Sequence, residues 1–289
     1  SNGLQTNGIL LDDEWCRHLS TYNFLVGISI DGPAEIHNKF RRTIKGEETH
    51  SLVMKGLSAL RRNKVEHNAL TLVSRSNVDK PLTVYNYLKG LDIKYHQYIE
   101  CVEFAPSGEL MPFAINGVEW GIFLCTIFDE WYKNDRLSVS VRLFDSILSI
   151  FLDNRVNVCS MSNDCTEYFV VEHNGDVYPC DFFVLPEYRL GNIMNKNWND
   201  FLESPVYKFF GEKKRRWNEK CNTCKFLHFC AGCCLKNRPF HDKNPECLSI
   251  LCEGWKMFYQ HTLTRFAELA DYIRKQQQKD EIIRAKYEK

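Results

Sequence analysis

Short apolar runs alternate with amphipathic patterns over the first hundred residues of the chain. Strands are predicted where apolar residues run together, at residues 4–6, 25–30, 68–73 and 95–104. Helices are predicted where apolar residues recur on one face, at residues 51–64 and 81–91. Leu52, Leu57 and Leu60 share the apolar face of the first helix, with Lys55 on the opposite face. This alternation predicts a parallel sheet with right-handed crossovers, in open or barrel form.

The pattern changes in the second half of the chain, first to apolar helices and then to loops. Helices are predicted over residues 117–133 and 141–153. Residues 167–180 contain two β-rich arms around Asn174-Gly175, which is a strong signal for a hairpin. Loops and a short helix near residues 198–210 follow. A final amphipathic helix is predicted from about Glu253, with a polar tail over residues 274–289.

Composition and charge indicate a folded protein without a preference for a polyanionic partner. Of its 289 residues 44% are hydrophobic and 26% charged, which excludes a disordered or collagen-like chain. Basic and acidic residues balance at 37 each, and the run Lys213-Lys214-Arg215-Arg216 is interpreted as a solvated helix face. The most apolar stretch, residues 120–128, is far shorter than the roughly 20 residues that span a bilayer. We therefore expect a cytoplasmic protein with no nucleic-acid partner and no membrane partner.

Thirteen cysteines are the most informative feature of the sequence. Only three lie in the first half, and ten lie between Cys159 and Cys252. The count is odd and no secretion signal is visible, so a disulfide framework is disfavoured. A dense thiol cluster in an intracellular protein indicates a metal site, and soft thiolates suit either iron–sulfur clusters or zinc. If the metal were zinc, His228 would be the first additional ligand to consider.

The cysteine spacing forms one pattern with two halves. In the hairpin half, nine residues separate Cys165 from Gly175 and four residues separate Gly175 from Cys180. The loop half has the spacing C-x2-C-x5-C-x3-C from Cys221 to Cys234, and Cys252 lies eighteen residues further on. With Cys159 there are eight thiols, the number that ligates two four-iron clusters. The same thiols could also supply tetrahedral zinc sites. Other cysteines fall outside the pattern: Cys16, Cys101 and Cys125 are interpreted as small buried apolar residues, and Cys233 and Cys247 are given no ligand role.

The block from Cys159 to Cys252 resembles a SPASM domain, the auxiliary-cluster domain of many radical S-adenosylmethionine enzymes. Within that group the chain is most similar to the anaerobic sulfatase-maturating enzymes, and the similarity extends to the strand phrases LQTNG and GISIDGP near the start. The resemblance implies two auxiliary [4Fe-4S] clusters with interleaved ligands. One would be held by Cys159, Cys165, Cys180 and Cys234. The other would be held by Cys221, Cys224, Cys230 and Cys252.

The resemblance also implies roles for four further residues. Asp181, directly after Cys180, matches the proposed catalytic base of the family. Ser29 and Arg41 match positions that contact the amino acid end of S-adenosylmethionine, and the guanidinium fork of Arg41 suits a carboxylate. Asn7 matches a residue near the peptide substrate. Without the resemblance, Asp181 could simply accept backbone hydrogen bonds, Ser29 could be a buried strand residue, and Arg41 could be an exposed arginine.

One motif of the family is missing from this sequence. The radical-generating cluster requires CxxxCxxC on an early loop, and the nearest spacing here, Cys230-x3-Cys234, lacks the third cysteine. The chain is therefore expected to be a C-terminal fragment that lacks the early strands of the barrel and cannot cleave S-adenosylmethionine by itself. S-adenosylmethionine and a third [4Fe-4S] cluster are expected in the full-length protein only.

Together these observations predict an α/β fold, a partial radical S-adenosylmethionine (β/α) barrel followed by a cysteine-rich SPASM domain with a β-hairpin and a C-terminal helix. The expected divisions are residues 1–110 for the barrel, 111–158 for connecting helices, 159–255 for the SPASM domain and 256–289 for the terminal helix and tail.

The function implied by the resemblance is oxidation of a sulfatase Cys or Ser, in a Cys/Ser-x-Pro-x-Arg motif, to Cα-formylglycine, with flavodoxin or ferredoxin as electron donor. Two alternatives remain open: another SPASM-type peptide-modifying radical enzyme, and a non-catalytic zinc-binding cysteine-rich module.

Overall fold

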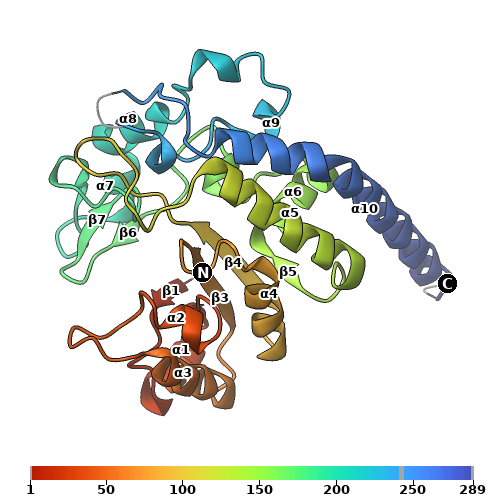
Figure 1. The fold of residues 1–289 in the computed structure, drawn as a ribbon, viewed down its shortest axis with the longest axis horizontal. Coiled ribbons are helices and arrows are strands. Elements are labelled where there is room, and N and C mark those ends of the chain that lie inside the picture. The colour runs from red at the N-terminus through yellow and green to blue at the C-terminus, as the bar shows by residue number, and fades with distance from the viewer. Residues whose placement is uncertain (1, 241–243, 288–289) are drawn as a thin grey trace.

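The computed structural model describes residues 2–240 and 244–287, with side chains as far as residue 281. Its first half contains a sheet of five parallel strands in the order β1-β2-β3-β4-β5 (Figure 1). The strands are β1 (Asn2–Thr6), β2 (Phe24–Ser29), β3 (His67–Val73), β4 (Tyr95–Glu100) and β5 (Ser140–Val141). The predicted parallel sheet and partial barrel are confirmed.

Helices connect each strand to the next, as the alternating pattern predicts. They are α1 (Asp13–Thr21), α2 (Ala34–His37), α3 (His50–Arg62), α4 (Pro81–Gly90) and α5 (Gly117–Asn134). Helix α1 begins at an Asp12 cap and α5 at a capping box between Asn116 and Glu119. The fourth strand ends at Glu100 instead of continuing to Phe104, because the chain beyond it turns and Phe104 forms an isolated antiparallel bridge with Leu110.

The carboxyl ends of the parallel strands meet at one edge of the sheet. Thr6 pairs with Ile28, and Val73 pairs with Glu100, so neighbouring strands end at nearly the same level. In parallel α/β sheets and barrels this edge is where ligands bind. Residues that follow the strands directly are therefore the first candidates for a site.

Helix α10 (Cys252–Tyr287) lies along α5 and α6 (Arg142–Asp153), and the three helices share an aromatic core (Figure 1). The core is built from Phe128, Trp131, Phe144, Phe258 and Phe266. Helices α5 and α10 cross at glycines: a Cβ added at Gly254 would lie 1.8 Å from the carbonyl oxygen of Gly117. This close crossing fixes the position of the first turn of α10.

The remaining region, between α6 and α10, contains a second sheet and short helices. Its antiparallel strands are β6 (Val170–Val171), β7 (Asp176–Tyr178) and β8 (Gly191–Asn192), and the predicted hairpin turns at Gly175, which has φ +84°. Its helices include η1 (Cys159–Met161), η2 (Pro186–Tyr188), α7 (Trp198–Leu202), α8 (Pro205–Lys213), η3 (Glu219–Cys221), α9 (Leu227–Cys230) and η4 (Leu235–Asn237).

Polar contacts join this region to the end of β4. The amide of Asn237 donates to the carboxylate of Glu100 at 2.7 Å, and the ammonium of Lys236 lies 2.6 Å from the carboxylate of Glu103. Lys236 also lies over the ring of Phe182, 4.3 Å from its centroid. The segment that carries Phe182 is thus held against the carboxyl edge of the parallel sheet.

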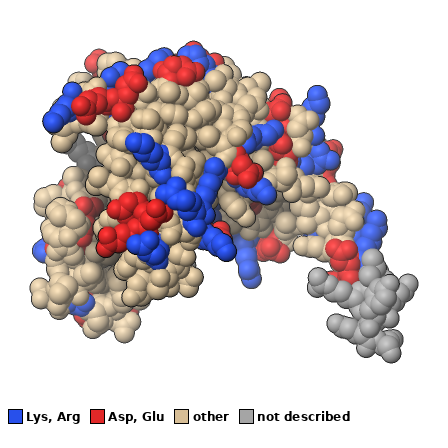
Figure 2. All heavy atoms as spheres, turned by 90° about the horizontal axis from the view of Figure 1, so that it is seen from below, with Lys and Arg blue, Asp and Glu red and all other residues tan. Residues whose placement is uncertain are grey.

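The surface seen in Figure 2 carries basic and acidic side chains side by side. One member of the basic run at residues 213–216 is not at the surface: Lys214 is fully buried, with 0% of its area exposed. Its interpretation as part of a solvated helix face is wrong, because α8 ends at Lys213 and the next residue turns inward. Within the part of the chain that the structure describes, no helix is long and apolar enough to cross a membrane.

Candidate functional site

The thiols of Cys221, Cys224, Cys230 and Cys252 line one cavity. Cys221 ends η3, Cys230 ends α9, and Cys252 is the first residue of α10, so three separate elements bring these side chains together. The cavity is also lined by Phe226, Leu227, Leu248, Trp255 and Tyr259. Four soft donors with apolar and aromatic walls form a pocket whose chemistry suits a thiolate-bound metal group.

The thiols of Cys159, Cys165, Cys180 and Cys234 gather beside the hairpin. Burial raises the pKa of Cys165 to about 11, and the neighbouring charge of Cys159 adds to the rise. Burial raises the pKa of Cys180 to about 12, with a further contribution from Cys165. Burial also raises the pKa of Cys234, and Cys180 adds to it. Each member of this second set thus has another member as an electrostatic neighbour.

All thirteen cysteines are free thiols. No group of three His, Cys, Asp or Glu side chains within residues 2–240 and 244–281 is arranged to hold a metal ion. Burial favours the neutral thiol, because an apolar surrounding disfavours the thiolate. A metal bound at these cysteines would reverse this preference, since coordination deprotonates the thiol.

Asp181 lies at an exposed position next to Cys180 and is contacted by Tyr168. The Tyr168 hydroxyl donates to Oδ1 of Asp181 at 3.2 Å and lies 3.9 Å from Sγ of Cys180. The Cys180 thiol itself lies 3.5 Å from the same carboxylate oxygen. Burial raises the pKa of Tyr168, and the nearby Cys180 adds to the rise, so the hydroxyl is a neutral donor. The sequence analysis did not predict a role for Tyr168 at the site. Its position three residues after Cys165 was the one signal that could have indicated it.

The sheet edge holds the other predicted site residues. Asn7 directly follows β1 and is exposed, and Ser29 is the last residue of β2 and is half-buried. Arg41 is half-buried and makes a two-point ion pair with buried Asp31, with Nε at 2.6 Å and Nη2 at 3.1 Å from the carboxylate oxygens. The fork of Arg41 therefore already holds a carboxylate of the chain itself. Asp31 also accepts a hydrogen bond from the amide of Leu72, which joins β2 to β3.

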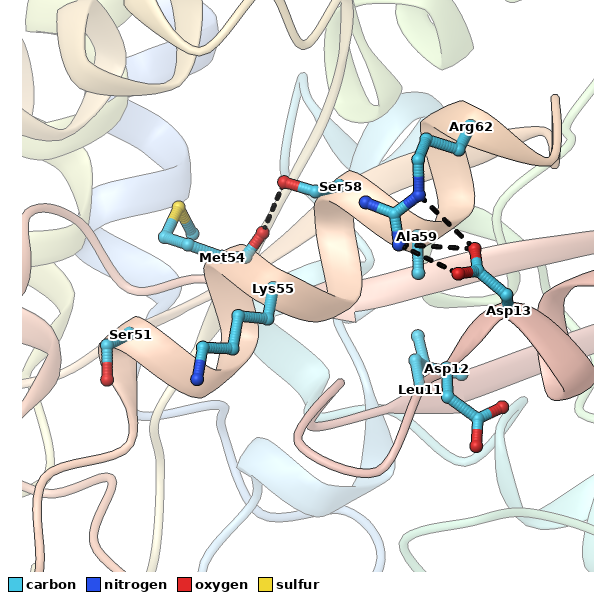
Figure 3. A pocket seen from close by; sticks show the side chains of 9 residues that line it. All are labelled: Leu11, Asp12, Asp13, Ser51, Met54, Lys55, Ser58, Ala59 and Arg62. Atoms are coloured by element: carbon cyan, nitrogen blue, oxygen red, sulfur yellow. Dashed lines mark hydrogen bonds and ion pairs between the residues drawn. The ribbon is translucent and has the colours of Figure 1, made fainter.

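A hollow of about 570 Å³ lies apart from these residues, between α1 and α3 (Figure 3). Asp13 of α1 and Arg62 of α3 form an ion pair across it, and the side chain of Lys55 lies on α3 as well. The hollow contains none of the predicted cysteine, cofactor or substrate residues. It therefore contributes nothing to the assignment of the site.

Comparison with known proteins defines the class of this chain. The family model of the SPASM iron–sulfur cluster-binding domain matches residues 159–225. The solved structure of native anSMEcpe with bound AdoMet and the Cp18Cys peptide has a TM-score of 0.86 and 34% identity, over 94% of this chain and 76% of that one. The fold and the thiol-lined region are therefore those of a radical S-adenosylmethionine protein with a SPASM domain.

Curated relatives identify the family. The serine-type anaerobic sulfatase-maturating enzyme of Bacteroides thetaiotaomicron is 38% identical over 95% of this chain and 70% of its own length. The cysteine-type enzyme of Clostridium perfringens strain ATCC 13124 is 35% identical over 94% of this chain and 75% of its own length. The chain belongs to the anaerobic sulfatase-maturating enzyme family. The resemblance seen in the cysteine pattern is thus confirmed.

Proposed function

We propose that this chain provides the substrate-receiving edge and the auxiliary iron–sulfur region of a maturase that oxidises a sulfatase Cys or Ser to Cα-formylglycine. The observation that carries the proposal is the cavity lined by Cys221, Cys224, Cys230 and Cys252 within a chain of this family. The solved relatives with bound Cp18Cys or Kp18Cys peptide support a peptide substrate, for which we propose the Cys/Ser-x-Pro-x-Arg motif.

The ligands of a four-iron cluster each bind a different iron, so they need not converge on one point as the ligands of a single metal ion do, and we assign the two sets of cysteines to two such clusters. The four cavity thiols would hold one [4Fe-4S] cluster, and the four thiols beside the hairpin, Cys159, Cys165, Cys180 and Cys234, would hold the other. When bound, such clusters supply an electron acceptor whose potential depends on burial and on hydrogen bonds to sulfur. The protein contributes the ligands, the aromatic walls and the surrounding charges.

Asp181 is the base of the proposed reaction. Its exposed carboxylate can accept the proton that the target thiol or hydroxyl loses, provided the peptide places that group within hydrogen-bond reach. Tyr168 holds one carboxylate oxygen through its hydroxyl and leaves Oδ2 free of any hydrogen bond within the described residues. Tyr168 is therefore a positioning residue for Asp181.

Residues at the carboxyl edge of the sheet would receive the cofactor and the peptide. Ser29 would contact the amino acid end of S-adenosylmethionine, and Asn7 would contact the peptide. Arg41 uses Nε and Nη2 for Asp31, and among the described residues Nη1 makes no hydrogen bond. We expect Nη1 to be the donor available to the cofactor carboxylate. S-adenosylmethionine supplies the radical chemistry when it is bound to a third [4Fe-4S] cluster.

These 289 residues contain no CxxxCxxC motif to hold that third cluster. We therefore expect them not to cleave S-adenosylmethionine on their own, and we expect flavodoxin or ferredoxin to serve as electron donor for the full reaction. Anaerobic incubation of the reconstituted chain with dithionite and S-adenosylmethionine tests this point. Release of 5′-deoxyadenosine would contradict it.

Iron and sulfide analysis of the anaerobically reconstituted chain tests the ligand assignment. We expect about eight iron and eight sulfide per chain, because two cubane clusters hold four of each. Cys221→Ser and Cys180→Ser should each lose about half of this content. Cys247→Ser, which alters a half-buried thiol outside both sets, is the matched control and should keep all of it. Zinc without sulfide would overturn the assignment.

A further inference from the structure

Two cations are fully buried in the cysteine-rich region. Lys214 and Arg238 both have 0% of their area exposed. Lysine and arginine are almost never fully buried without an ionic partner, because removing a charge from water costs several kcal/mol. Each of these side chains therefore requires a source of compensating negative charge.

No carboxylate provides it within residues 2–240 and 244–281. Lys214 donates only to backbone carbonyls, those of Ser160, Ala231 and Cys233. Arg238 uses all five of its N–H donors on backbone carbonyls, namely those of Gly232, Arg216, Pro245, Lys214 and Cys233. These bonds satisfy the donors, but neutral carbonyls leave both positive charges uncompensated.

The cysteines are the ionisable groups that surround the two cations. The carbonyls that accept from Lys214 belong to Ser160, next to Cys159, and to Ala231 and Cys233, which flank the turn between Cys230 and Cys234. Arg238 donates to the carbonyls of Gly232 and Cys233 in the same turn. Each cation thus lies against backbone that carries members of both proposed cluster sites.

We propose that Lys214 and Arg238 are the shared counter-ions of the two auxiliary iron–sulfur clusters and that they raise the reduction potentials of these clusters. The proposal rests on the cysteine ligand assignment given above. A four-iron cluster with four thiolate ligands is anionic and becomes more so on reduction. A buried positive charge stabilises the reduced form more than the oxidised form, and the effect is strong where water is excluded.

A raised potential suits the chemistry of this site. A cluster would accept an electron more readily from a substrate that is being oxidised if the reduced form of the cluster is stabilised. The two cations also explain why a folded chain would tolerate eight thiolates in one region, since like charges repel and opposite charges within a few ångströms offset that repulsion.

The test is to remove each charge while keeping a hydrogen-bond donor, using Lys214→Gln and Arg238→Gln. Midpoint potentials of the reconstituted protein are measured anaerobically by redox titration followed by electron paramagnetic resonance. We expect the equilibrium constant for reduction of at least one cluster to fall about tenfold, a shift of about 59 mV to lower potential for a one-electron couple. Arg216→Gln, which removes an exposed charge from the same run, should leave the potentials unchanged.

Charge-conserving variants separate electrostatics from structure, because both cations also hold backbone carbonyls. Lys214→Arg and Arg238→Lys should retain the wild-type potentials even if cluster loading falls. If the glutamine variants assemble no iron–sulfur cluster, the charge-conserving variants must assemble clusters for the proposal to stand. Loaded glutamine variants with wild-type potentials would overturn it. A wild-type chain that assembles no cluster would instead refute the ligand assignment on which it rests.

Discussion

The crossing of α5 and α10 allows a stability prediction worked directly from the structure. A Cβ added at Gly254 would lie 1.8 Å from the carbonyl oxygen of Gly117 and 2.9 Å from the amide nitrogen of Gly121. Ordinary contacts of a Cβ begin at 3.4 Å, so Gly254→Ala requires the two helix backbones to separate by roughly 1.5 Å. Neither obstructing atom belongs to a flexible side chain that could rotate away.

The expected loss in the free energy of unfolding is about 2 kcal/mol for Gly254→Ala. Overpacking a close-packed interior costs about 1–3 kcal/mol, and a backbone obstruction lies at the upper end of that range. Alanine recovers roughly 1 kcal/mol through its higher helix propensity. For a chain of this size a net loss of about 2 kcal/mol lowers Tm by roughly 4–8 °C.

Thermal unfolding of the cluster-free, reduced protein, followed by circular dichroism, measures this loss. Gly90→Ala is the matched control, since a Cβ there meets nothing within 4 Å, and its Tm should stay the same or rise slightly. Because Cys252 lies two residues before Gly254, the alanine variant should also bind less iron after reconstitution. An unchanged Tm for Gly254→Ala would show that the helices do not cross as closely as described.

Three further predictions concern single side chains. Burial lowers the pKa of His96 from 6.5 to about 4. Its contribution to stability is therefore complete above pH 6.5 and is lost as the pH falls from 6.5 to about 4. In urea unfolding, the free energy of unfolding should fall by about 2 kcal/mol between pH 7 and pH 5 because of this residue. Tyr168→Phe removes the hydroxyl beside Cys180 and should lower the potential of one cluster by less than Lys214→Gln does. Arg41→Met leaves buried Asp31 unpaired and should cost about 2 kcal/mol in urea unfolding.

Each of these predictions has a control on the same chain. His96→Gln should flatten the pH dependence of unfolding over the same range, and an equally steep profile would contradict the assignment to His96. Tyr272→Phe alters an exposed tyrosine of α10 and should leave both potentials unchanged. Arg42→Met removes an exposed arginine whose side chain donates to the carbonyl of Gly46, and it should change stability by less than about 0.5 kcal/mol. A similar cost for Arg41→Met would contradict a stabilising ion pair.

Local patterns were sufficient to predict most elements of the fold. The helix expected at residues 51–64 spans His50–Arg62, and the strand expected at residues 68–73 spans His67–Val73. Hydrophobic periodicity depends on neighbours along the chain, so a single sequence carries it. The glycine crossing was not predictable in this way, because Gly117 and Gly254 are separated by more than a hundred residues and neither lies in a recognisable motif.

Two packing interactions near the site were not predicted, for the same physical reason. The basic run at residues 213–216 has the composition of a solvated surface, and only the tertiary fold turns Lys214 inward at the end of α8. The expectation that Arg41 contacts the cofactor carboxylate stays a prediction, but its ion pair with Asp31, ten residues earlier, was not predicted. In both cases the residue type indicated the chemistry, an arginine fork or a positive charge, while the partner depended on packing that sequence spacing does not reveal.

The proposed interleaving of the two cysteine sets would have a physical basis in the backbone between Cys230 and Cys234. Ala231, Gly232 and Cys233 have φ values of 45°, 70° and 65°, so three consecutive residues adopt the left-handed conformation. This turn separates Cys230, which lines the cavity with Cys221, from Cys234, which neighbours Cys180. Such a conformation is costly for residues other than glycine and persists only when surrounding groups hold it.

The groups that hold this turn are the two buried cations. Lys214 donates to the carbonyls of Ala231 and Cys233, and Arg238 donates to those of Gly232 and Cys233. The same positive charges act on thiols of both sets. One pair of side chains therefore fixes the backbone between the two proposed sets of cysteines and, in our proposal, supplies positive charge to both cluster sites. Because the two roles depend on different properties, donor geometry and net charge, the glutamine and charge-conserving variants can separate them.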